Sequence, residues 1–398
     1  MTTLRPMRFG VFAAPFHHVS ENPTWAFARD IELAVHADRL GFEECWYGEH
    51  HSGGTELINA PELMIAAAAQ VTNRIRLGTG VSSLPYHNPF MLADRFVQLD
   101  HMTMGRVMLG VGPGALPGDA YMMGINPSQQ RPRMEECLEA VLALWRGDEP
   151  VNMETEWFTL RDAQLQYPAF QPGGIEVAVA ATFSPSGPRL AGRFGTGLLS
   201  ISATQPQAFE ALARHWQTAQ EVAAAHGTTV ERSGWRMVGP MHLAPTMEQA
   251  RHEVEHGLKE WVDYFLKVGA IPILGELDTS GDLVDAVNDS GVGVIGTPEM
   301  AVEQIKRLEE QSEGFGTYML MMHEWADREA TLRSLELFSR WVMPTFRGTT
   351  EWMGRSRDYT VENREVFLGE VRAALRTATD NYRAERNERR EATAKEQG

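Results

Sequence analysis

The chain has 398 residues, of which 43% are hydrophobic and 22% are charged, so it has ordinary globular composition and enough length to bury a large core. Its 53 acidic residues exceed its 36 basic residues by 17, and the resulting negative field would repel nucleic acids and anionic membrane surfaces. Only Cys45 and Cys137 occur, both in apolar stretches, and there is neither a secretory leader nor an apolar run of about 18 residues, so we expect a cytoplasmic protein with buried free thiols.

Short apolar runs, typical of buried strands, alternate with helical patterns along the chain. The first run is RFGVFAA at 8–14, and the helical pattern after it starts at Asn22-Pro23 and stops at Gly41. Helical patterns also follow seven later strand-like runs, at 42–49, 75–84, 106–112, 175–181, 197–203, 235–244 and 317–322. The chain therefore contains eight strand–helix units.

Eight such units predict an α/β fold in which helices cover a parallel sheet. A closed (β/α)8 TIM barrel over residues 1–346 accommodates eight units better than an open sheet does. The alternative is a doubly wound open sheet. Such a sheet would be expected to carry a dinucleotide-binding glycine loop after its first strand, where this sequence reads FAAPFHH.

Three segments fall outside the repeat. Insertions at about 147–174 and 269–296 are rich in glycine and proline, and loops of this length are usually lids or disordered segments. The third segment, 347–398, is expected to be a partly helical C-terminal extension. Its polar ending, RAERNERREATAKEQG, is typical of a solvated helix, and a contact between subunits is the alternative.

In a parallel barrel the active site lies at the carboxyl ends of the strands, where the loops into the helices begin. The polar side chains predicted to lie at these ends are His17, His18, Glu49, His50, His51, His87, Asn88 and Arg131. Three of these residues form the stretch EHH, which ends the second strand-like run.

The two histidines of EHH are candidates for a metal site, a proton-transfer site or a structural pair. Neighbours on a strand point to opposite faces, so His50 and His51 would not readily bind one ion, and no other ligand pattern accompanies them. We therefore expect no metal. One imidazole, with an ordinary pKa of about 6.5, would suit proton transfer at neutral pH, and a structural pair remains the alternative.

Three further stretches are candidates for ligand contact. Ser184, Ser186 and Gly187 stand where the helix after the fifth strand should begin, and helix amides with hydroxyls suit a phosphate, although a serine helix cap is an alternative. The stretch VGPGALPGD at 111–119 lacks the Lys-Ser/Thr ending of a triphosphate-binding loop and is more typical of a turn. Gly80 allows close approach of a flat ligand, or a strand bulge.

The order of these motifs is more specific than any one of them. The first strand, then EHH, RLGTGVSSLPYHNP, DHMTMGRVMLGVGPG, Arg131 and GTPEMAVEQI follow one another as in the bacterial luciferase-like flavin-dependent monooxygenase superfamily, which the chain resembles over about residues 7–345. The stretches SLPYHNPFMLADRFVQLDHMTMGRVMLGVGPGALPGDAYMMGI and RSGWRMVGPMHLA resemble the limonene monooxygenase type within it.

The resemblance implies a barrel that binds reduced FMN delivered by a separate NAD(P)H-dependent flavin reductase. It also implies reaction with dioxygen, through a flavin C4a-hydroperoxide, to oxygenate a small apolar organic substrate, which the subtype suggests is terpenoid-like. The family habit is a homodimer or homotetramer. No nucleic acid or membrane partner is expected.

The resemblance also assigns roles to residues of the barrel mouth. His50 matches the catalytic imidazole of the family's Glu-His-His, and Glu49 matches the residue beside the flavin. Thr79, Gly80 and Val81 match the strand that carries a non-prolyl cis peptide behind the isoalloxazine, which is expected here between Gly80 and Val81.

Residues near the flavin phosphate are assigned in the same way. Arg131, Ser184 and Ser186 match phosphate-side positions. Pro113 stands where luciferase itself has a phosphate-binding arginine. Either Arg131 then carries more of the phosphate's charge, or another cation replaces the missing one.

Two other functions remain open: a deazaflavin-dependent oxidoreductase of the same fold, and a non-catalytic flavin-binding protein. Retention of EHH favours catalysis. A flavin–oxygen adduct is lost as peroxide in water, so oxygenation needs an apolar enclosure. The insertion at 269–296 and the stretch YMMGI at 121–125 are candidates for it, and core packing is the alternative for those methionines.

Overall fold

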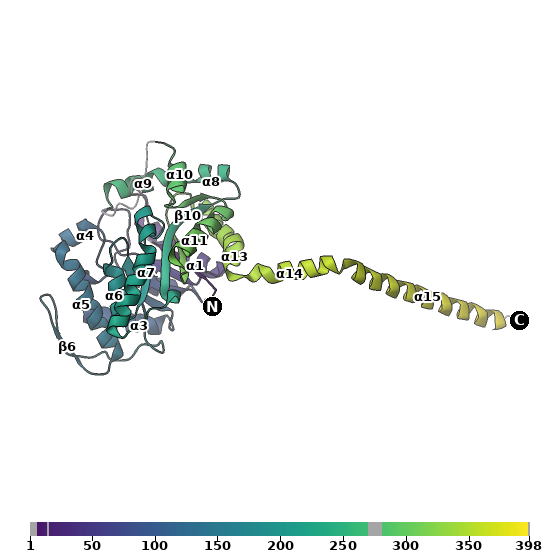
Figure 1. Cartoon of the computed structure of the whole chain (residues 1–398), viewed down its shortest axis with the longest axis horizontal. Coiled ribbons are helices and arrows are strands. Elements are labelled where there is room, and N and C mark those ends of the chain that lie inside the picture. The colour runs from purple at the N-terminus through teal and green to yellow at the C-terminus, as the bar shows by residue number, and fades with distance from the viewer. Residues whose placement is uncertain (1–5, 14–15, 270–280, 397–398) are drawn as a thin grey trace. The chain divides into compact units, whose positions relative to one another are not determined.

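The computed structural model describes residues 6–13, 16–269 and 281–396. The chain divides into two compact units, residues 1–346 and residues 347–398 (Figure 1). Each unit is described by itself below.

The first unit is a closed barrel of eight parallel strands. Going round the barrel, the strands are β1 (Arg8–Ala13), β2 (Glu44–Tyr47), β3 (Arg76–Thr79), β5 (Val107–Gly112), β8 (Glu176–Ala181), β9 (Gly197–Ser200), β10 (Trp235–Leu243) and β12 (Thr317–Met321). The pairing of β12 with β1 closes the ring. The predicted (β/α)8 barrel is therefore confirmed, and the open-sheet alternative is wrong because an open sheet leaves two edges unpaired. Two short strands, β4 (Ser82–Ser83) and β11 (Val294–Gly296), extend the sheet at β5 and β10.

Helices surround the barrel (Figure 1). They are α1 (Pro23–Leu40), α2 (Pro61–Ala69), α3 (Pro89–Met102), α4 (Pro117–Met122), α5 (Pro127–Arg146), α6 (Ser186–Phe194), α7 (Pro206–His226), α8 (Met247–Val254), α9 (Leu258–Lys267), α10 (Leu283–Ser290), α11 (Pro298–Ser312), α12 (Arg328–Leu337) and α13 (Met343–Arg347). Asparagines cap α1, α3 and α5, and the side chain of each accepts a hydrogen bond from a backbone N–H of the first turn. A proline directly follows each asparagine in the chain, where the helix needs no N–H donor. Asn88, a candidate site residue, is one of these caps.

The strands bury alternate side chains in two cores. One core lies between strands and helices, and the second contains residues such as Phe12, Trp46, Met108 and Met319 from the same strands. Alternation along a strand explains why both faces of the sheet are apolar. Cys45 and Cys137 are buried free thiols, as predicted, and burial raises the pKa of both.

Charged residues occupy the amino ends of the strands. Arg236 is completely buried, with its Nε 2.7 Å from Glu44 Oε2 and its Nη2 2.6 Å from Glu176 Oε1. Arg8 also pairs with Glu44, and Arg76 also pairs with Glu176. This ion-pair network closes the amino-terminal end of the barrel, so the carboxyl ends of the strands are left to form a site.

The two insertions differ in structure. The segment 147–174 contains an antiparallel hairpin of β6 (Val151–Glu154) and β7 (Thr159–Ala163), so it is neither a disordered segment nor a structureless loop. For 269–296, the predicted lid falls partly on 270–280, which lie outside the described residues. The rest of that insertion forms α10 and β11, and β11 pairs with β10.

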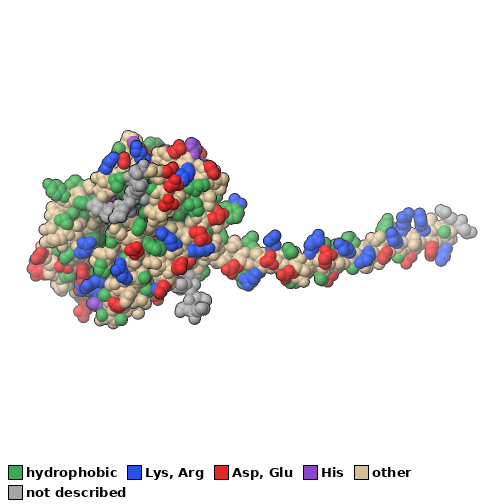
Figure 2. Space-filling view, turned by 45° about the horizontal axis from the view of Figure 1, so that its top comes forward, with side chains coloured by type: hydrophobic (Ala, Val, Ile, Leu, Met, Phe, Trp, Pro, Cys, Tyr) green, Lys and Arg blue, Asp and Glu red, His purple; other side chains and the backbone are tan. Residues whose placement is uncertain are grey.

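The second unit consists of α14 (Thr349–Glu362) and α15 (Arg364–Glu396). Its described side chains are exposed or half-buried, and Figure 2 shows basic, acidic and hydrophobic side chains interspersed along it. This exposure agrees with the predicted solvated helix, and the contact between subunits stays an untested alternative. Over the described parts of the chain, no helix combines the length and the apolar character that crossing a membrane requires.

Candidate functional site

A cavity of about 770 Å³ lies at the carboxyl ends of the barrel strands. Phe12 of β1, Gly112 of β5, Ala181 of β8 and Met321 of β12 line it, together with the Gly80–Val81 turn after β3. Its volume falls within the range of about 300–1,000 Å³ that is typical of small-molecule sites. The cavity therefore lies where a barrel of this kind places its active site.

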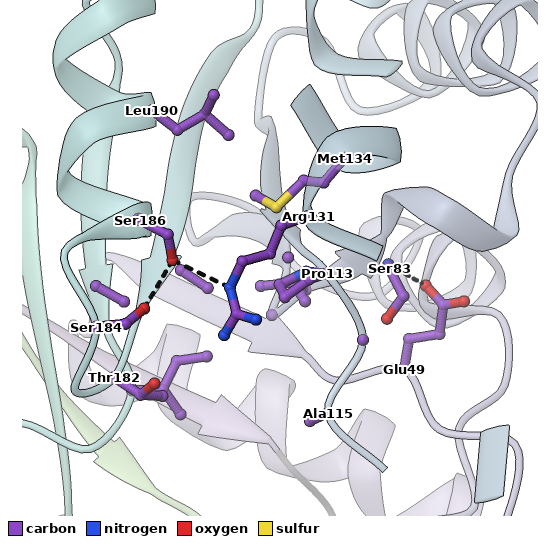
Figure 3. Close-up of a pocket in the computed structure, with 18 of the residues that line it drawn as sticks. Glu49, Ser83, Pro113, Ala115, Arg131, Met134, Thr182, Ser184, Ser186 and Leu190 are labelled. Carbon is purple, nitrogen blue, oxygen red and sulfur yellow. Dashed lines mark hydrogen bonds between the residues drawn. The ribbon is translucent and has the colours of Figure 1, made fainter. Parts of the chain in front are cut away.

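One end of the cavity is suited to an anion. Arg131 of α5 donates from Nε to Ser186 Oγ at 3.3 Å, and Ser184 Oγ lies 2.7 Å from Ser186 Oγ (Figure 3). No side chain caps the start of α6, which follows Pro185. The alternative of a serine helix cap is therefore wrong, and the first amides of α6 remain available beside two hydroxyls and a guanidinium.

Two more arginines reach this end from α6, and sequence reasoning did not single them out. Arg193 is paired with Glu135 and Glu139. The Arg189 side chain makes no ion pair within the described residues, and it also lines the cavity. Pro113 lines the cavity without charge, and its carbonyl accepts a hydrogen bond from Gln130 at 2.9 Å. Arg189 is therefore the candidate for the cation that position 113 lacks.

The Gly80–Val81 peptide is cis, as the resemblance predicts. A Cβ built on Gly80 would lie only 2.5 Å from Phe12 Cε2, so a larger residue here would require the Phe12 ring to shift. Thr79 is buried and does not line the cavity. Its hydroxyl donates to the Gly110 carbonyl at 2.9 Å and so ties β3 to β5.

Glu49 lines the cavity as an anchored carboxylate. It accepts hydrogen bonds from the Ser83 amide at 2.8 Å (Figure 3) and contacts His51 Nε2 at 3.0 Å and His87 Nε2 at 2.9 Å. Burial alone would raise the pKa of Glu49, but the two imidazoles and the amide outweigh burial and lower it. His51 and His87 therefore serve Glu49 rather than the cavity centre.

His50 points away from His51 and lies between two other carboxylates. Its Nε2 lies 2.9 Å from Glu56 Oε2, and its Nδ1 lies 3.5 Å from Asp119 Oδ2. The predicted divergence of the two histidines is correct, but strand alternation is not its cause, because β2 ends at Tyr47. The histidines diverge in a loop, toward different carboxylates.

The surroundings of His50 change its expected protonation. Burial lowers the pKa of an imidazole, but the charges of Glu56 and Asp119 outweigh burial and raise the pKa of His50 to about 10. The interpretation of His50 as an imidazole titrating near neutral pH is therefore wrong. The two carboxylates therefore favour the protonated form of His50, an imidazolium, which is a proton donor and a fixed positive charge.

Aromatic side chains of α9 form an apolar wall of the cavity. Trp261, Tyr264 and Phe265 line it together with Phe16, and the Phe16 and Tyr264 rings pack edge to face with centroids 5.5 Å apart. Sequence reasoning missed this wall and also missed Glu56 and Asp119. By contrast, the side chains of the YMMGI stretch at 121–123 are exposed and do not line the cavity, so neither core packing nor the predicted enclosure explains its methionines.

A second cavity, of about 320 Å³, is lined by two of the residues that the sequence predicted to lie at the strand ends, His17 and His18. His17 Nδ1 and carboxylate oxygens of Glu21 and Glu324 lie within 4.8 Å of one another, as metal ligands can. The Arg29 guanidinium already binds both carboxylates, so a cation is present among them. This cluster is accounted for as an ion-pair network.

The chain is similar to several known proteins. A family model described as luciferase-like monooxygenase matches residues 7–312. Limonene 1,2-monooxygenase of Rhodococcus erythropolis is 46% identical over 95% of this chain and 96% of that protein. 4-Hydroxyprotoasukamycin monooxygenase of Streptomyces nodosus subsp. asukaensis is 41% identical over 89% of this chain and 96% of that protein. The solved oxygenating constituent of 3,6-diketocamphane monooxygenase of Pseudomonas putida, in complex with FMN, is 30% identical and has a TM-score of 0.70. That comparison covers 85% of this chain and 98% of the solved one.

Proposed function

This chain belongs to the luciferase-like monooxygenase family, and from that premise we propose that it is a flavin-dependent monooxygenase that uses reduced FMN and dioxygen to oxygenate a small apolar organic compound. A separate NAD(P)H-dependent reductase would supply the reduced FMN. One observation carries the proposal: a single cavity combines an anion cradle at α6 with a charged histidine beside an aromatic wall. Relatives named for limonene and diketocamphane support a terpenoid-like substrate.

The residues of the cavity fit FMN. The Gly80–Val81 peptide, Ala180 and Ala181 offer a surface without bulky side chains, on which a flat ring system can lie. At the other end, α6 amides, Arg131 and Arg189 offer donors and charge for a phosphate. Reduced FMN, when bound, supplies the two electrons with which one atom of dioxygen is transferred to substrate and the other is reduced to water.

The chain's own groups would bind, enclose and supply protons. His50 holds a proton at neutral pH within the cavity and presents a positive charge to any anion that develops there. Phe12, Phe16, Trp261 and Phe265 exclude water from the same space and offer contacts to an apolar substrate. Glu49 holds β4 through the Ser83 amide.

The pure protein should bind reduced FMN more tightly than oxidised FMN and should form product only when a flavin reductase is added. The reasons are the order of motifs that the chain shares with its family and the lack of a dinucleotide glycine fingerprint after β1. Anaerobic titration of both redox forms and product analysis check this. NADH oxidation by the pure protein at the rate of product formation would contradict it.

The same preparation separates the two alternatives. A deazaflavin-dependent oxidoreductase would bind reduced deazaflavin in preference to reduced FMN and would transfer hydride without consuming oxygen. A non-catalytic flavin-binding protein would bind FMN but would show no substrate-dependent oxygen uptake.

Arg131→Ala should weaken FMN binding by about ten- to a hundred-fold and riboflavin binding by much less, because a charge-assisted contact with phosphate contributes about 1.5–3 kcal/mol. Arg189→Ala should show the same selectivity. Arg193→Ala is the matched control, because Arg193 lines the same cavity but is already paired with Glu135 and Glu139. Equal losses for FMN and riboflavin would place the phosphate elsewhere, and titration by fluorescence quenching measures both.

A further inference from the structure

The two ring nitrogens of His50 face carboxylates that come from different parts of the fold. Asp119 belongs to α4 and is buried, with 1% of its surface exposed, and Glu56 lies in the loop after β2 and is also buried. These two carboxylates, together with the adjacent His51 and the Tyr264 phenol behind Glu56, are the titratable groups around the His50 ring.

The two carboxylates differ in their distance from His50. Asp119 Oδ1 accepts hydrogen bonds from Ser52 Oγ at 2.5 Å and from the His51 amide at 3.1 Å, and Asp119 Oδ2, which lies 3.5 Å from His50 Nδ1, makes no hydrogen bond of good geometry within the described residues. Glu56 Oε2 likewise makes no hydrogen bond of good geometry there, but its contact with His50 Nε2 is shorter, at 2.9 Å. Glu56 is therefore the closer partner of His50.

The other oxygen of Glu56 connects the pair to the aromatic wall. Tyr264 of α9 donates from Oη to Glu56 Oε1 at 2.9 Å, and Tyr264 itself lines the cavity. Tyr264 packs against Phe16 on one side and against Phe265 on the other, with ring centroids 5.5 and 5.0 Å apart. The position of α9 is thus transmitted to His50 through one phenol and one carboxylate.

We propose that Glu56 is a positioning residue that keeps His50 as an imidazolium in the cavity and that links His50, through Tyr264, to the α9 wall. The chemical reason is that two ionised buried carboxylates near one another repel unless one takes up a proton or a cation lies between them, and the His50 imidazolium supplies that cation. The catalytic meaning of this link rests on the proposed function, because a charged His50 matters only where oxygen chemistry needs a proton or a positive charge.

The direct test is a histidine side-chain NMR titration of the ligand-free protein labelled with ¹⁵N-histidine. His50→Asn identifies the His50 signals by their loss. In the unsubstituted protein His50 should remain protonated at pH 8, and in Glu56→Gln its titration midpoint should fall by at least about one pH unit, a tenfold loss of proton affinity. Tyr264→Phe should lower the midpoint in the same direction by less. A neutral His50 at pH 7 in the unsubstituted protein, or an unchanged midpoint in Glu56→Gln, would overturn the proposal.

Two further variants guard the test against a general loss of structure. Glu56→Asp keeps the charge and should restore most of the midpoint. Glu253→Gln is the matched control, because Glu253 contacts His242 at 2.8 Å outside the cavity, and its removal should leave the His50 signals unmoved. A His50 midpoint that fell equally in Glu253→Gln would show a nonspecific effect and refute the role of Glu56.

An activity measurement adds a readout that a merely structural role would not shift. With reduced FMN, reductase and substrate, the alkaline limb of the kcat–pH profile in Glu56→Gln should move to lower pH by the shift seen in NMR, while KM for substrate changes by less than about threefold. A loss of activity with no shift of the limb would count against the proposal. The NMR arm needs no flavin, so failure of FMN binding or oxygenation would refute the proposed function while leaving the NMR result to judge Glu56.

Discussion

Replacing His50 with alanine should lower the rate of substrate oxygenation by at least about a hundred-fold while leaving the fold and the binding of reduced FMN in place. General acid catalysis by a positioned side chain contributes about 10²–10⁴ in rate, and His50 is the group in the cavity that sits charged between Glu56 and Asp119. Without it, the electrons of reduced FMN should appear as hydrogen peroxide instead of product. The measurement is the ratio of product to peroxide per NADH consumed by the reductase.

His51→Ala is the control for this experiment. His51 contacts Glu49 rather than Glu56, and His87 and the Ser83 amide would still hold the Glu49 carboxylate. The variant should therefore lose stability or FMN affinity before it loses rate. Normal oxygenation by His50→Ala together with failure of His51→Ala would reverse the assignment, and normal oxygenation by both would leave the pair a structural one.

Glu44→Gln should destabilise the barrel by about 3–5 kcal/mol, the usual result of removing one partner from a buried ion pair. Glu44 is completely buried and binds Arg236 at 2.7 Å and Arg8 at 3.3 Å, while Trp46 Nε1 donates to it at 2.9 Å. The neutral amide would leave much of the buried charge of Arg236 uncompensated. Urea unfolding followed by tryptophan fluorescence measures the loss.

The pH dependence of the same variant has a defined sign. Burial alone would raise the pKa of Glu44, but the neighbouring arginines outweigh it and lower the pKa. A carboxylate with a lowered pKa stabilises the fold above its ordinary pKa of about 4.3, and that stabilisation is lost as the pH falls through the folded pKa. The difference between Glu44→Gln and the unsubstituted protein should therefore shrink below about pH 4. Glu32→Gln is the control, because its pair with Arg328 is exposed and should contribute at most about 1 kcal/mol at any pH.

Local patterns were sufficient to predict the barrel. A buried parallel strand reads as a continuous apolar run, and helix starts such as Asn22-Pro23 and Asn88-Pro89 carry their own capping chemistry, so both signals lie within a few residues. The hairpin inside 147–174 was missed because its strands, VNME and TLRDA, are short and bury little: Val151 and Met153 are half-buried, and Leu160 is the buried residue of the second strand. A two-stranded ribbon on the surface has no strong periodic signal.

The sequence predicted only part of the candidate site. It did not predict the residues that surround His50 or the second arginine of the anion-binding end. The EHH stretch and the position of the cis peptide followed from the order of motifs. For the serines at the start of α6, the sequence left two interpretations open, a phosphate site and a helix cap, and the structure shows no side-chain cap there. The sequence could have indicated Arg189 as a phosphate-side residue, since it follows Ser186 by three residues on the same helix. It could not have indicated the contact between Glu56 and Tyr264, because 208 residues separate them in the chain.

The sequence alone determined the number of barrel strands, the buried thiols, the family and the identity of the histidine pair, because these depend on composition, periodicity and the order of short motifs. Only the tertiary structure decided which way each histidine faces and which charge His50 carries. Closure of the barrel brings the EHH loop, α4 and α9 to one mouth, and there Glu56 and Asp119 raise the pKa of His50 to about 10. A pKa depends on the distance to neighbouring charges and on burial, and neither is written in the spacing of residues along the chain.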